Sequence, residues 1–149
     1  MRKFAIAITT AALATSLTAC SGAGNDAPTR MINQVTDGVE ANLKDSNTLI
    51  YLRNIYIAVN EAGDASLVGT IINQKDTNDA LIALAINQQE IKISPLPALQ
   101  NKPITFGGPT SNASASLPNS GLVAGAHTKI SFFFGLGGTV SVDALVVSA

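Results

Sequence analysis

The chain has 149 residues, of which 46% are hydrophobic and 13% are charged, and its formal net charge is −1. This length and composition predict one folded domain with a sizeable core and exclude a highly charged, disordered chain. The basic residues beyond Lys3 do not form the basic patch that nucleic-acid binding requires, because they are scattered: Arg30, Lys44, Arg53, Lys75, Lys92, Lys102 and Lys129.

The first residues are typical of a bacterial secretory signal peptide. Arg2 and Lys3 precede an apolar run, residues 4–17, and small residues follow it. The run is shorter than the roughly 20 residues that a membrane-spanning helix needs, and no second run of this length follows. The sequence therefore argues against an integral membrane protein.

The stretch Leu17-Thr18-Ala19-Cys20 has the pattern of a lipobox. It predicts that residues 1–19 are removed and that Cys20 is acylated, which places the protein on the extracytoplasmic face of the cell membrane. The alternative is an ordinary cleavage after Ala19 that leaves a reactive thiol. We favour acylation because Cys20 is the only cysteine and an exported protein gains little from one thiol. A bacterial lipoprotein carries two or three acyl chains, enough for stable attachment.

Residues 20–30 are small, polar and rich in turn formers, which predicts a flexible tether before a domain over 31–149. Short apolar segments separated by turn residues then predict strands. In chain order these are 39–43, 49–59, 67–72, 80–86, 91–93, 104–106, 129–134 and 139–147.

Several residues qualify this pattern. The alanines and leucines of 80–86 favour a helix, but the length of the segment and its neighbours favour a strand, which we assign. Gly69 predicts a bulge or a close backbone approach. We expect Pro95-Leu96-Pro97 to end regular pairing, and only short pairing within 107–121. Residues 135–138 predict a hairpin turn.

Seven to nine short strands without an amphipathic helix predict an all-β fold, an antiparallel β-sandwich of immunoglobulin-like type. The chain has no Trp and no Cys pair, which excludes a true antibody-type domain.

No set of residues predicts catalysis. A nucleophile needs a base, and the only histidine, His127, has no nucleophile motif beside it. We expect His127 to be a solvent-exposed residue at a strand edge, although it is also the one candidate metal ligand. Besides His127, the mature chain offers Met31 and the acylated Cys20, too few ligands for a closed transition-metal site.

Two further stretches allow two interpretations each. Residues 76–79 resemble a calcium loop but lack the following Gly and the distant Glu, so a solvated hairpin loop is favoured. Phe132, Phe133 and Phe134 form an aromatic run whose alternate side chains point to opposite faces. Core packing on both faces is favoured, and an exposed patch that binds a partner is the alternative.

The order of segments from Val35 onward resembles small actinobacterial lipoproteins related to the periplasmic copper chaperone family. The resemblance is carried by residues 35–41, 53–57, 67–73, 79–81 and 125–147. It implies a cupredoxin-like or immunoglobulin-like sandwich. The family holds Cu(I) with His and Met ligands, and those positions are not matched here, because no Met follows Met31 and His127 falls outside the ligand-bearing region.

The leading hypothesis from the sequence is a lipid-anchored, non-enzymatic binding or structural module of the cell envelope. The alternative is a copper-chaperone-like protein on the same scaffold, and the least favoured is a hydrolase that uses surface carboxylates. The membrane is the expected partner through Cys20, together with an envelope protein or a small ligand. No cofactor is expected.

Overall fold

The computed structural model of the protein describes residues 38–149, and all of their regular secondary structure is β. The expected signal peptide, the lipobox with Cys20, the tether and residues 31–37 lie outside these described residues. The strands are β1 (Val39–Lys44), β2 (Leu49–Val59), β3 (Ala65–Asn73), β4 (Asp79–Ile86), β5 (Gln89–Ile91), β6 (Leu96–Ala98), β7 (Ile104–Phe106), β8 (Ser116–Leu117), β9 (His127–Phe134) and β10 (Gly138–Ser148).

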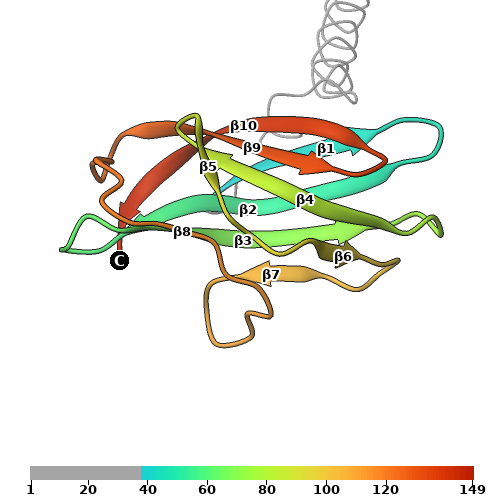
Figure 1. The fold of residues 1–149 in the computed structure, drawn as a ribbon, viewed down its shortest axis with the longest axis horizontal. Helices are drawn as coiled ribbons and strands as arrows, with labels where there is room; N and C mark the ends of the chain where they lie inside the picture. Colours follow the sequence, from blue (N-terminus) through green and yellow to red (C-terminus); the bar gives the residue numbers. More distant parts are fainter. Residues whose placement is uncertain (1–37) are drawn as a thin grey trace, which may run out of the picture. The chain divides into compact units, whose positions relative to one another are not determined.

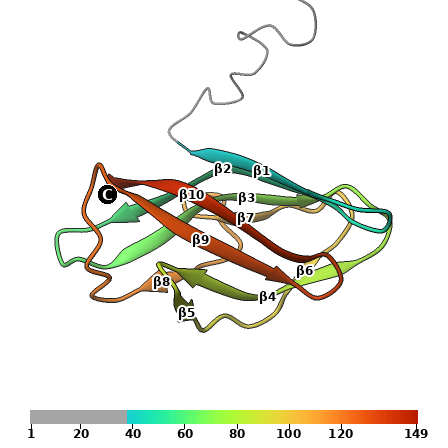
Figure 2. The same ribbon diagram turned by 90° about the horizontal axis from the view of Figure 1, so that it is seen from above.

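The ten strands form one curled sheet with two layers (Figures 1 and 2). One layer contains β1, β2, β3, β7 and β8, and the other contains β4, β5, β6, β9 and β10. Strand β10 joins the layers. It pairs antiparallel with β9 along most of its length and parallel with β2 at Val146–Ser148.

The all-β prediction is confirmed, but two details of the predicted fold are wrong. The sheet has ten strands rather than seven to nine, and the contact between β2 and β10 is parallel, so the sheet is mixed and not purely antiparallel. Alternation of apolar residues indicates that a strand exists, but it does not indicate which distant strand lies beside it.

The prediction that Pro95-Leu96-Pro97 ends pairing is also wrong. Leu96–Ala98 forms β6 and pairs with β4, with Pro97 opposite Ala80. An edge strand tolerates proline, because the missing N–H can lie on the side that has no neighbour. The strand expected at 91–93 pairs earlier, at Gln89–Ile91, because Asn87 and Gln88 have positive φ angles and close a two-residue hairpin turn.

The core lies between the two layers and follows the expected alternation. In β10, for example, Val142, Ala144 and Val146 are buried, whereas Ser141 and Asp143 are exposed. The largest fully buried side chains come from both layers: Phe106, Phe132, Ile50, Leu52, Ile55, Ile57, Leu67, Ile71, Leu81, Leu84, Ile86 and Ile130.

Strand β2 contains a β-bulge at Asn54. Upstream of it Ile50 and Leu52 are buried, and downstream Ile55 and Ile57 are buried, so the core-facing positions shift by one residue. The pairing with β3 shifts over the same stretch, and Asn54 has a φ of 53°. One extra residue in β2 thus keeps apolar side chains in the core on both sides of the bulge.

Gly69 lies against this bulge, which confirms the predicted close approach. A Cβ atom built on Gly69 would lie 2.5 Å from Ile55 Cδ1 and 2.9 Å from the Asn54 carbonyl oxygen. Its φ of 144° is also unfavourable for any other residue. The bulge itself is on the neighbouring strand.

We predict that Gly69→Ala lowers the free energy of unfolding by about 2–4 kcal/mol, because the new methyl group meets backbone as well as a side chain. Gly63→Ala is the matched control. Gly63 also has a positive φ, but nothing lies within 4 Å of a Cβ built there. The control should cost about 1 kcal/mol. Equal losses for the two variants in urea denaturation would contradict the close-packing interpretation.

A second prediction concerns Thr128, which lies on the core face of β9 and is 4% exposed. Its Oγ1 has no hydrogen-bond partner among the described residues. Thr128→Val keeps the shape of the side chain and removes the unpaired hydroxyl, so we expect the free energy of unfolding to rise by about 1 kcal/mol. Thr128→Ser keeps the hydroxyl and loses the methyl group, and it should be destabilising. Urea denaturation of both variants measures the two changes. A lower free energy of unfolding for Thr128→Val would contradict the conclusion that the Thr128 hydroxyl is buried without a hydrogen-bond partner.

Candidate functional site

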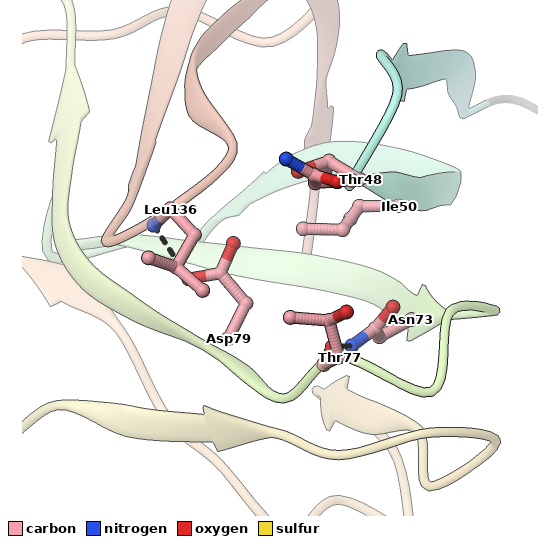
Figure 3. Close-up of a pocket in the computed structure, with 7 residues that line it drawn as sticks. Thr48, Ile50, Asn73, Thr77, Asp79 and Leu136 are labelled. Atoms are coloured by element: carbon pink, nitrogen blue, oxygen red, sulfur yellow. Dashed lines mark hydrogen bonds between the residues drawn. The ribbon is translucent and has the colours of Figure 1, made fainter.

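Several loops meet at one end of the domain. Figure 1 shows the β1–β2, β3–β4 and β9–β10 turns together at this end and the C-terminus at the other. We call this region the loop end, defined by residues 45–48, 74–78, 99–103 and 135–137. Its centre is a polar cluster, drawn in Figure 3, that is lined by Asn47, Thr48, Ile50, Asn73, Thr77, Asp79 and Leu136.

Asp79 anchors the β9–β10 turn. Its Oδ1 accepts a hydrogen bond from the Leu136 N–H at 2.9 Å (Figure 3). Its Oδ2 accepts one from the Gly137 N–H at 2.9 Å. Oδ1 also accepts from the N–H of Ala80 at 2.7 Å, and the Gly135 N–H donates to the Ala80 carbonyl at 3.0 Å. Three hydrogen bonds therefore hold the turn on the first residues of β4, and the bond from Ala80 fixes the Asp79 carboxylate.

Asn73 connects the two layers. Its side chain is buried, and its Nδ2 donates to the carbonyl oxygens of Thr77 and Ala98, both at 2.8 Å. Its Oδ1 accepts from the Lys75 N–H at 2.9 Å. One amide thus closes the β3–β4 loop and links β3 to β6 in the other layer.

The polar cluster does not hold a ligand. The space between its side chains does not admit a water-sized group. Residues 76–79 were expected to form a solvated hairpin loop, and 74–78 do connect β3 to β4. Asp79, however, is bound to backbone N–H groups, so its carboxylate is occupied by protein donors. The sequence did not single out Asn73, and it placed Asp79 in a solvated loop and not in an anchoring role. An Asx residue at each boundary between an apolar run and a loop was the available signal.

His127 is exposed and is the first residue of β9, opposite Leu145 of β10. It therefore lies at the start of a strand, close to where the sequence placed it. Over residues 38–149, no group of three or more His, Cys, Asp or Glu side chains is arranged to hold a metal ion. No helix in this part of the chain is long and apolar enough to cross a membrane.

The aromatic run divides between the two faces of β9. Phe132 and Phe134 are buried in the core, and Phe133 is half-buried on the opposite face. There Phe133 lines a shallow depression of about 360 Å³ with Ala83, Ala85, Gln88 and Glu90. Of the three phenylalanines proposed for a partner patch, only Phe133 is positioned to contact a partner.

Comparison with solved structures identifies PCuAC copper-chaperone domains as structural neighbours. The chain is similar to the apo PCuAC domain from PmoF1, with a TM-score of 0.59 and 18% identity over 73% of this chain and 100% of that domain. It is also similar to the copper-bound PCuAC domain from PmoF2, with a TM-score of 0.59 and 16% identity over 73% of this chain and 99% of that domain. No protein-family model matches the chain, and no curated protein matches it.

These neighbours confirm the expected resemblance to the copper chaperone fold. The relation to actinobacterial lipoproteins stays a prediction. At this level of identity the likeness shows the fold alone, so the copper ligands have to be tested on this chain's own residues. The chain has two methionines and one cysteine, all before residue 38, and His127 is its only histidine. The described residues therefore do not supply the several soft ligands that a closed Cu(I) site requires.

We predict that Asp79→Ala lowers the free energy of unfolding by about 2–3 kcal/mol, because it leaves backbone N–H groups of the β9–β10 turn without their acceptor. The Leu136 and Gly137 amides should also exchange hydrogen faster. Asp76→Ala is the control, since Asp76 is an exposed carboxylate in the same loop. It should change stability by no more than about 0.5 kcal/mol. Unchanged exchange at both amides in Asp79→Ala would contradict the anchoring role.

Proposed function

We propose that the protein is an extracytoplasmic, non-enzymatic protein of the copper-chaperone type, held at the membrane by a lipid on Cys20. One observation carries the proposal: 73% of the chain matches nearly the whole of PCuAC domains, one of which is copper-bound. The lipobox supports the anchor and the extracytoplasmic location.

The chain's own residues limit how it could handle copper. Cu(I) prefers imidazole and thioether ligands, and the mature chain offers one of each, His127 and Met31. His127 is exposed, so its imidazole is accessible to an ion or to a ligand on a partner. Such a site has few ligands, which favours weak, exchangeable binding. Copper is here a cargo and not a resident cofactor.

A second candidate is the envelope module that binds a partner and no metal. The specific observation in its favour is the ligand count: the PCuAC-like scaffold is present, but in residues 38–149 it brings no metal-binding cluster together. The two candidates share the fold, the anchor and the absence of catalysis, and they differ in one measurable property.

Titration of the mature lipidated chain in detergent with Cu(I), against a chromophoric copper chelator, separates them. A copper-chaperone-type function predicts about one copper per chain, and at least about tenfold weaker binding in His127→Asn, as loss of one of few ligands would cause. The control is Lys129→Gln, because Lys129 is exposed on β9 close to His127. This variant should bind copper as tightly as the unmodified sequence does. Binding no tighter than that of the urea-unfolded chain would exclude copper handling and leave the envelope module.

A further inference from the structure

Two of the three most exposed large apolar side chains in the described region lie in the loop end or on the strand beside it. Leu136 is 65% exposed in the β9–β10 turn, and Ile82 is 48% exposed on β4. The turn passes close to Ile82, because a Cβ built on Gly135, the residue before Leu136, would lie 3.9 Å from Ile82 Cγ2. The third, Val123, is 69% exposed at the other end, beside Val59 and the last residues of β10.

The backbone that carries Leu136 and Ile82 is fixed at both residues. The Leu136 N–H donates to Asp79, and so does that of Gly137, which holds the main chain of the turn. Ile82 is the extra residue where the pairing of β4 with β9 shifts between Leu81 and Ala83. Bulges commonly redirect a side chain in this way. Two apolar side chains are thus presented to solvent by rigid elements.

Three lysines lie in or next to the loop end. Lys75 and Lys102 belong to it, Lys44 precedes it as the last residue of β1, and the Lys75 Nζ donates to the Ser46 carbonyl. Of the nearby carboxylates, those of Asp45 and Asp79 accept backbone N–H bonds, and that of Asp76 is exposed. The loops of the opposite end, 60–64 and 119–126, contain Glu61 and Asp64 and no Lys or Arg. The loop end thus balances three lysines against three aspartates, whereas the opposite loops are only acidic, so the loop end is the end more compatible with anionic headgroups.

We propose that the loop end rests on the lipid bilayer, with Leu136 and Ile82 in the headgroup region and the three lysines over anionic lipids. The inference rests on the proposed anchor at Cys20. Residues 20–37 span at most about 60 Å when extended, so the anchor keeps the domain within reach of the bilayer. A weak second contact is then intramolecular and needs little affinity. Two apolar side chains are far fewer than the 20–30 residues per side of a stable protein interface.

The test uses Cys20 itself. If Cys20 is acylated, Leu136→Cys introduces the only thiol that can be labelled in the mature chain. We would attach an environment-sensitive NBD fluorophore there and, as the matched control, to Val123→Cys at the opposite end. Both labelled lipoproteins are reconstituted in vesicles of phosphatidylcholine and phosphatidylglycerol, with and without doxyl-labelled lipids.

The proposal predicts blue-shifted emission and quenching by doxyl lipids at position 136 and neither at 123. The shift should diminish when phosphatidylglycerol is omitted. One label per chain with equal spectra at both positions overturns the docking and leaves the anchor intact. Two labels per chain show that Cys20 is not acylated, which overturns the anchor and the docking with it. A shift at 136 only in native membranes, and not in vesicles, identifies a protein partner and rejects the lipid surface.

Discussion

The bulge at Asn54 is the constraint on which the arrangement of the two layers depends. Strand β2 pairs with β1 along one edge as far as Ile55, just past the bulge, and the same edge then pairs with β10 at Ile57–Val59. Strand β2 therefore changes its neighbour near the point at which its buried residues change from even numbers (Ile50, Leu52) to odd numbers (Ile55, Ile57). The extra residue bends β2, and its apolar face remains in the core on both sides. Gly38 and Gly69 make room for it, since a Cβ on either would meet Asn54.

Strand β10 joins the two layers by hydrogen bonds only at Val146–Ser148, near the C-terminus. At the loop end, other contacts have to hold the layers together. Asn73 provides one, as its amide links β3 to the carbonyl of Ala98 in the other layer. Gly137 provides a second through close packing, since a Cβ there would lie 2.8 Å from Thr48 Cγ2 and 3.0 Å from Leu43 Cδ2. Polar side chains that resemble a binding site are thus occupied by structural hydrogen bonds.

The parts of the fold that could be predicted from the sequence are those that depend on local pattern. Alternation located most of the strands, and Gly69 was correctly assigned to a close approach because only one residue type fits there. The parallel contact between β2 and β10 and the pairing of Leu96–Ala98 could not be predicted, since both depend on neighbours distant in sequence. The roles of Asn73 and Asp79 were missed for a related reason. Asn and Asp are common in loops, and the sequence does not show whether such a side chain is solvated or binds the backbone of a distant turn.

The fold and the ligand chemistry of this protein are separable, because a fold like that of PCuAC domains does not by itself define a copper site. The scaffold depends on buried positions such as Ile50, Phe106 and Phe132, which any suitably sized apolar residue can occupy. A metal site depends on a few side chains whose replacement leaves that core unchanged. In residues 38–149 only His127 has a suitable nitrogen donor, and it lies on the exposed face of β9, apart from the polar cluster. A chain can therefore keep this fold without keeping a metal site.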